Sequence, residues 1–142
     1  MKPSELNVDI EMKALLSGRI SVDSVPVPVY AAGEKPTTGV PDDFIEIFYN
    51  GYLNSISENR VIVKGAMAVV MSNRLFEDGS VKTNRVKKLL QQFEDCIDGV
   101  STTHYFLKLS PDGFITPTTE NQTTGYSTTI LNVEWRTLST TI

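Results

Sequence analysis

The chain contains a single cysteine, Cys96, and a single histidine, His104. One cysteine excludes an internal disulfide, and the lack of further thiols and imidazoles removes the ligand sets that bind structural zinc or iron. Phosphate-binding glycine loops are missing too, because neither G-x-x-x-x-G-K-[ST] nor G-x-G-x-x-G occurs. We therefore expect no structural metal and no cofactor.

Long hydrophobic runs and an excess of positive charge are also absent. No apolar stretch approaches the roughly 20 residues that a membrane helix needs, and the N-terminus lacks the apolar segment of a signal peptide. The formal net charge of −4 argues against nonspecific nucleic-acid binding, which depends on lysine and arginine displacing counterions. We expect one domain, residues 1–142, that folds in a reducing cytoplasm without membrane contact.

The clearest positive signal is an apolar stripe at helical spacing, made of Val86, Leu89, Leu90, Phe93 and Ile97. Apolar residues three and four apart share one helix face, so the stripe predicts a helix from about Val81 to Ile97, ended by Asp98-Gly99.

A first helix is expected between Ser4, a favourable N-cap residue, and Gly18. Its apolar arc is wider than a normal amphipathic stripe and includes Leu6, Val8, Ile10, Met12, Ala14, Leu15 and Leu16. Such an arc indicates cover on two sides, with a neighbouring subunit as one candidate for the second cover.

Strand patterns fill the segment between the two helices. Val25–Tyr30 is β-branched but contains two prolines, which confine it to a sheet edge or an irregular strand. Phe44–Tyr49 reads as a strong strand, and Asn50-Gly51 either turns it back or forms a bulge in a longer strand; we favour the bulge. The strand then continues through Ile56, turns at Ser57-Glu58-Asn59, and returns as a long antiparallel partner from Arg60 to Ser72.

After the second helix we expect strands at Thr103–Leu109 and Tyr126–Leu138, with a turn at Ser110–Gly113 and a short strand at Phe114–Thr116. Thr116–Thr129 is rich in Thr, Asn, Gln and Gly, which suits either a mobile loop or a hairpin arm. The order of elements predicts an α+β fold: an antiparallel β-sheet with two α-helices packed on one face, long loops and a β-hairpin arm.

Catalytic patterns are weak throughout the chain. His104 lies in a predicted strand without a nearby nucleophile motif, so a structural or surface role is the favoured interpretation. Cys96 follows Phe93 near the end of the second helix, where a reduced cysteine behaves as a small hydrophobe. No pair of carboxylates belongs to a recognisable catalytic or metal-binding motif. We expect no enzymatic activity.

The only basic cluster is Lys82, Arg85, Lys87 and Lys88 on the second helix. Lys82, Arg85 and Lys88 follow i, i+3 spacing opposite the apolar stripe. A solvated helix face is the favoured interpretation, and an acidic protein partner is the alternative.

The order of elements resembles the tail terminator (tail-completion) family of long-tailed bacteriophages over most of the chain. The similar segments are Ile10–Ile20, Val27–Tyr30, Pro41–Ile47, Val86–Ile97 and Ile130–Trp135. This resemblance implies a structural virion protein that forms a ring, expected to be a hexamer, at the tail or neck after assembly in the host cytoplasm. The ring would cap the tail tube protein, end its growth and meet the head-tail connector protein, while DNA passes through the lumen without specific binding.

Ring assembly of this kind uses heterologous contacts between two different patches. Loop composition predicts the candidate interfaces in the loop Ala32–Asp42, at the turn around Ser57 and in the arm Thr116–Gly125. Together with the basic helix face, the candidate residues are Pro36, Thr37, Pro41, Ser57, Lys82, Arg85, Lys88, Thr118, Asn121 and Thr124. Two alternatives stay open, another head-tail neck component and an α+β binding domain unrelated to phage.

Overall fold

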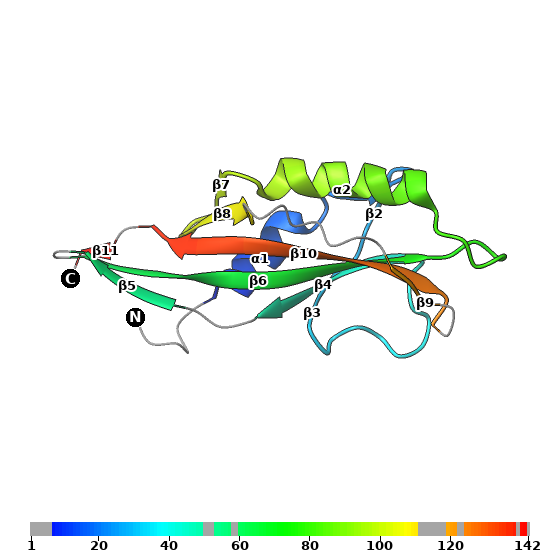
Figure 1. Cartoon of the computed structure of the whole chain (residues 1–142), viewed down its shortest axis with the longest axis horizontal. Coiled ribbons are helices and arrows are strands. Elements are labelled where there is room, and N and C mark those ends of the chain that lie inside the picture. Colours follow the sequence, from blue (N-terminus) through cyan, green and yellow to red (C-terminus); the bar gives the residue numbers. More distant parts are fainter. Residues whose placement is uncertain are drawn as a thin grey trace.

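The computed structural model describes residues 7–49, 53–57, 60–110, 119–121, 124–138 and 140–141. Within these residues lie two helices, α1 (Val8–Leu16) and α2 (Thr83–Ile97), and a mostly antiparallel sheet (Figure 1). Both helices pack into one hydrophobic cluster with the sheet, so they lie on the same face of it. The predicted α+β fold is therefore confirmed.

Two long strands form the centre of the sheet. Across it the order is β3 (Val29–Ala31), β4 (Asp43–Tyr49), β6 (Arg60–Arg74), β10 (Tyr126–Thr137), β8 (Tyr105–Leu109) and β7 (Val100–Ser101). β6 has 15 residues and spans about 50 Å. It pairs with β4 on one side and with β10 on the other, and this makes the molecule long in the strand direction (Figure 1).

Short strands extend the sheet at both ends. β5 (Leu53–Ser57) and β11 (Thr140–Thr141) pair with the beginning of β6, whereas β9 (Thr119–Asn121) pairs with the beginning of β10. A separate hairpin joins β1 (Ser21–Val22) to β2 (Val25–Pro26). β5 and residues 60–62 of β6 reach beyond both helices, so this end of the sheet is a projecting ribbon (Figure 1).

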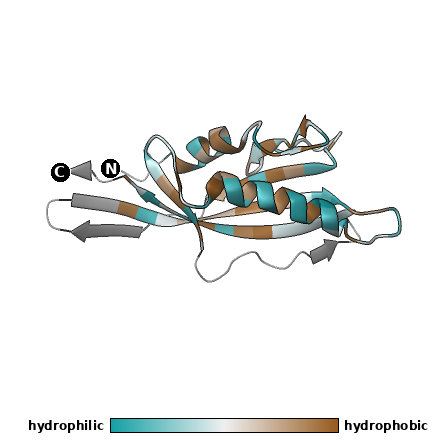
Figure 2. Cartoon of the chain, turned by 90° about the horizontal axis from the view of Figure 1, so that it is seen from above, coloured by the Kyte–Doolittle hydropathy of each residue, from teal (hydrophilic) through white to brown (hydrophobic). Residues whose placement is uncertain are grey.

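The core lies between the helices and the inward face of the sheet. Alternate residues of β6 point inward and are buried, namely Val63, Met67, Val69 and Met71. The predicted stripe of α2 meets them with Val86, Leu89, Phe93 and Ile97, all buried, while Leu90 packs at the margin. From above, the outward side of α2 is mainly hydrophilic (Figure 2). The helical and strand periodicities therefore meet in one core, as predicted.

Helix α1 starts later than expected. It begins at Val8 after Asn7, whose backbone N–H donates to the Tyr105 hydroxyl at 3.0 Å. Ser4, the expected N-cap residue, lies outside the described residues, and its assignment as cap is wrong because the first helical residue is Val8. The described residues cover only one side of α1, since Ile10 is 65% exposed.

The strand registers support a bulge between β4 and β5. Tyr49 pairs with Met67 and Leu53 pairs with Lys64. Three residues therefore separate the β4 and β5 positions where β6 has two, which is the one-residue offset of a bulge. Asn50 and Gly51 themselves lie outside the described residues.

Three details differ from the sequence prediction. The segment Val25–Tyr30 is divided between β2 and β3, and β3 runs parallel to β4 at the sheet edge. The edge position agrees with its prolines, but the parallel pairing was not predicted. β7 and the β1–β2 hairpin were not predicted either.

The arm after β8 is partly described. β9 pairs with Tyr126–Thr128 of β10, so the hairpin alternative is the one that the structure favours for this part of the arm. The expected turn at Ser110–Gly113 falls mostly outside the described residues, as do the short strand Phe114–Thr116 and the candidate residue Thr118.

Candidate interaction surfaces

Arg85 anchors the start of α2 to the sheet. Its Nε lies 3.0 Å from Oδ1 and 3.1 Å from Oδ2 of Asp43, and its terminal nitrogen also donates to Oδ2. Asp43 is buried at the start of β4 and accepts a further hydrogen bond from the side-chain amide of Asn73, at 2.7 Å. Hydrogen bonding to Asp43 raises the pKa of the Arg85 guanidinium above its usual range. A bidentate pair of this kind fixes helix and sheet relative to each other.

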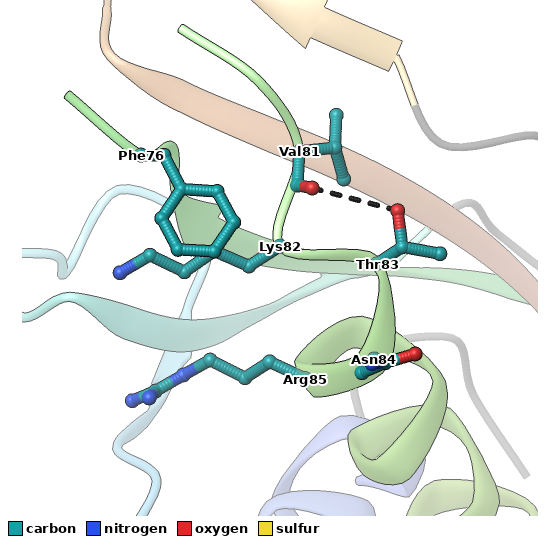
Figure 3. Close-up of a pocket in the computed structure, with 6 residues that line it drawn as sticks. All are labelled: Phe76, Val81, Lys82, Thr83, Asn84 and Arg85. Carbon is teal, nitrogen blue, oxygen red and sulfur yellow. Dashed lines mark hydrogen bonds between the residues drawn. The ribbon is translucent and has the colours of Figure 1, made fainter. Parts of the chain in front are cut away.

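Three grooves meet around Arg85. The first, of about 520 Å³, is lined by Phe76, Val81, Lys82, Thr83, Asn84 and Arg85 (Figure 3). The second, of about 350 Å³, lies between the β1–β2 hairpin and α2. The third, of about 330 Å³, runs from the same hairpin past Pro41 to Asp43. The surface at this end of the molecule is therefore indented on several sides of the Arg85–Asp43 ion pair.

Phe76 forms the exposed wall of the first groove. Its side chain is 53% exposed, and the Lys82 ammonium lies 5.4 Å from the centre of its ring. Figure 3 shows the Lys82 side chain alongside the Phe76 ring, with the Arg85 side chain extended in the same direction. In the turn, the Phe76 backbone N–H donates to the Ser80 carbonyl oxygen and the Gly79 N–H donates to the Phe76 carbonyl oxygen. Asp78 accepts from the Ser80 backbone N–H. Local hydrogen bonds thus present an aromatic ring and an amine to solvent together.

A second network ties the loop before β4 to β10. The Tyr126 hydroxyl donates to the carbonyl oxygen of Pro41 at 2.7 Å and accepts from Arg74 at 2.9 Å. Arg74 also pairs with Asp42 at 2.6 Å. The Phe44 ring packs edge-on against Tyr126 with 5.4 Å between the centroids. Because of these contacts, the loop Ala32–Asp42 is attached at the same end of the sheet as the grooves.

The predicted interface residues separate into two groups. Pro41, Lys82, Arg85, Lys88 and Thr124 belong to the end of the molecule where β6 finishes, which we call the loop end. Pro36 and Thr37 lie in the loop Ala32–Asp42, which leads to this end. Asn121 is in β9, at that same end, and Thr118 lies outside the described residues. Ser57 pairs with Arg60 at the opposite end of β6. Arg85 is not a free cation, because the ion pair with the buried Asp43 carboxylate occupies its guanidinium.

Sequence reasoning missed a third surface, the face of the sheet opposite the helices. Across it Ile130 lies beside Val70, which lies beside Glu46 in the next strand, and Phe48 lies beside Ala68. Ile130 is 39% exposed and Phe48 and Val70 are half-buried. The signal was available in the alternation of β10, whose outward positions include an isoleucine among polar residues.

His104 lies beside a carboxylate but outside the three grooves. Its Nδ1 is 2.7 Å from Oε2 of Glu11, and its ring is 63% exposed. Glu11 also accepts from the Thr102 hydroxyl at 2.7 Å and from the His104 backbone N–H at 3.0 Å. Partial burial raises the pKa of Glu11, but these hydrogen bonds outweigh burial and hold the pKa below its usual 4.5. These hydrogen bonds attach α1 to the segment that leads into β8.

Cys96 is half-buried on α2, and burial raises the pKa of its thiol. A raised pKa disfavours the reactive thiolate, which agrees with the interpretation of Cys96 as a small hydrophobe.

No family model matches the chain, and no curated protein matches it in sequence. Among the described residues, no group of three or more His, Cys, Asp or Glu side chains is arranged to hold a metal ion. In the same part of the chain, neither helix is long and apolar enough to cross a membrane.

Replacing Arg85 by methionine should destabilise the fold by about 2–3 kcal/mol, because the buried Asp43 carboxylate loses its partner. Urea unfolding followed by circular dichroism measures this change. The matched control is Lys88→Met, an exposed change one turn further along α2, expected to stay within about 0.5 kcal/mol. Equal stability of the two variants would contradict a structural role for the ion pair.

Acidification should weaken the contact between α1 and β8 through Glu11. Because the pKa of Glu11 is lowered by folding, its stabilising contribution is complete above its ordinary pKa of 4.5 and is lost as the pH falls through the lower folded value. Stability measured by urea unfolding from pH 7 downward should therefore fall more steeply for wild type than for Glu11→Gln. If the stability of both proteins falls equally with pH, Glu11 does not contribute to the pH dependence of stability.

Proposed function

We propose that this protein is the structural subunit of a phage tail terminator, a ring that caps the tail tube, stops its growth and joins the tail to the head connector. The proposal is supported by the order of elements. Helix α1, an edge strand, the long β4–β5–β6 hairpin, helix α2 and a closing strand pair follow in the order on which the family resemblance rests.

The observation that carries the proposal is the projecting ribbon, formed by β5 and residues 60–62 of β6. Neither helix covers it, and within the described residues only the two-residue strand β11 widens it (Figure 1). An isolated two-stranded hairpin is at best marginally stable in water, and stable sheets need further strands or a packed face. A partner that packs on the ribbon supplies this missing cover.

The same chain offers a different surface for the other half of such a contact. The ribbon is at one end of β6, and the grooves around Arg85 and the loop Ala32–Asp42 are at the other. Two unlike surfaces at opposite ends favour head-to-tail contacts, which close into a ring when the rotation between subunits permits. A second copy of this chain is therefore the partner that we assign to the ribbon.

Charge agrees with passage of DNA through such a ring. The net charge of −4 gives the surface little affinity for phosphates, so DNA can cross a lumen without being held. In this proposal the ring acts by its position at the end of the tail tube and by its closed shape, without catalysing a reaction.

Shortening the ribbon should abolish ring formation without unfolding the subunit. Residues 55–62 are replaced by Asn-Gly, which joins the paired residues Asn54 and Val63 through a two-residue turn. Light scattering and negative-stain images should show monomers in place of rings. The matched control replaces only Glu58 and Asn59 by Asn-Gly, keeps the full ribbon and should assemble as wild type. Rings formed by the shortened variant would refute the role of the ribbon.

The terminator role itself is tested with polymerising tail tube protein. Wild type should bind tube ends and shorten the tubes in electron micrographs as its concentration rises, whereas the shortened variant should leave their length unchanged. Rings that ignore tube ends would contradict the terminator role while leaving self-assembly intact. A monomer at every concentration that also ignores tube ends would contradict both.

A further inference from the structure

The exposed charges of α2 are separated by sign along the helix. Lys87 and Lys88 lie in its N-terminal half, Glu94 and Asp95 lie in its C-terminal half, and Gln91 lies midway. All are exposed except Glu94, which is half-buried. Helix α2 is the outermost layer on its side of the sheet, so this face is reachable along its whole length (Figure 1, Figure 2).

Helix stability does not explain this arrangement. The helix dipole favours acidic residues in the first turn and basic residues in the last, and α2 has neither. None of the four charged residues has an opposite charge three or four positions away on the helix. Among the described residues, none of the four takes part in a salt bridge. Asp95 accepts a hydrogen bond from the neutral side-chain amide of Gln91 at 3.0 Å. Within the described residues, these charges are therefore placed against the helix dipole and are not neutralised by an opposite charge.

The same charges become complementary when two copies of α2 lie antiparallel. Lys87 and Asp95 are each four residues from Gln91, and Lys88 and Glu94 are each three residues from it. A two-fold axis at Gln91 therefore sets Lys87 and Lys88 against Glu94 and Asp95 of the second copy, twice over. We propose that α2 docks antiparallel on α2 of a second copy of this chain about this axis.

Side-by-side docking is favoured over end-to-end docking because the ends of α2 are occupied. At the C-terminal end, Asp98 accepts a hydrogen bond from the Leu109 backbone N–H at 3.0 Å. At the N-terminal end, Lys82 lies over the Phe76 ring and Arg85 is bound to Asp43. The exposed side of the helix is what remains for a partner.

The contact is small and electrostatic. Helix α2 has 15 residues and is about 22 Å long, so one helix pair buries less surface than a stable interface of about 1,000 Å² needs. Association through it is therefore weak and sensitive to salt. A two-fold contact differs in symmetry from a head-to-tail ring contact, so it pairs two monomers or two rings and does not depend on the proposed function.

Charge reversal with restoration tests the pairing. K87E/K88E and E94K/D95K should each weaken self-association by about tenfold or more, because like charges then face each other. An equimolar mixture of the two variants should associate again. The fourfold variant K87E/K88E/E94K/D95K keeps the net charge and the complementarity, so it should associate as wild type does. Sedimentation velocity between roughly 0.05 M and 0.5 M salt measures all four samples.

The matched control is K108E/R136E, which reverses two exposed basic residues on the opposite face of the sheet and should leave association unchanged. The fourfold variant should also unfold at a higher temperature, since its acidic and basic halves agree with the helix dipole. The proposal is overturned if wild type shows no salt-sensitive association, if K87E/K88E associates like wild type, or if the mixture and the fourfold variant fail to associate.

Discussion

The fold depends on the burial of one face of the sheet beneath helices α1 and α2. Helices α1 and α2 place their buried residues on the same side of β6 and β10, and one cluster of apolar side chains holds the fold together. Two helices cover the middle of a strand about 50 Å long, but not its beginning and not its other face. The ribbon and the exposed sheet face around Ile130 both follow from this shortage of cover.

Much of this fold was predictable because the spacing of apolar residues along the chain indicates which side chains are buried. The stripe from Val86 to Ile97 gave α2, and the alternation along β6 and β10 gave the two central strands. Prolines 26 and 28 indicated an edge, but they carry no signal for direction, so the parallel pairing of β3 with β4 was missed. The start of α1 was also missed, because Asn7 is fixed by Tyr105, a residue distant in the sequence.

The interface residues were less predictable. Loop composition identified segments rich in proline and threonine, and some of these lie together at the loop end. Composition does not reveal that Arg85 is used internally, because its partner Asp43 is 42 residues away in the sequence. The sign pattern around Gln91 was present in the sequence, but it gained meaning only when the structure showed these side chains exposed and without salt bridges in the described part of the chain.

The central claim is that a neighbouring copy covers the ribbon, and amide hydrogen exchange tests it most directly. Exchange is followed over the ribbon, residues 53–57 and 60–62, in dilute monomer and in the assembled protein. The account predicts fast exchange in the monomer and strong protection after assembly, while the core strand positions of β10 remain protected in both. Equal protection of the ribbon in monomer and assembly would contradict the claim.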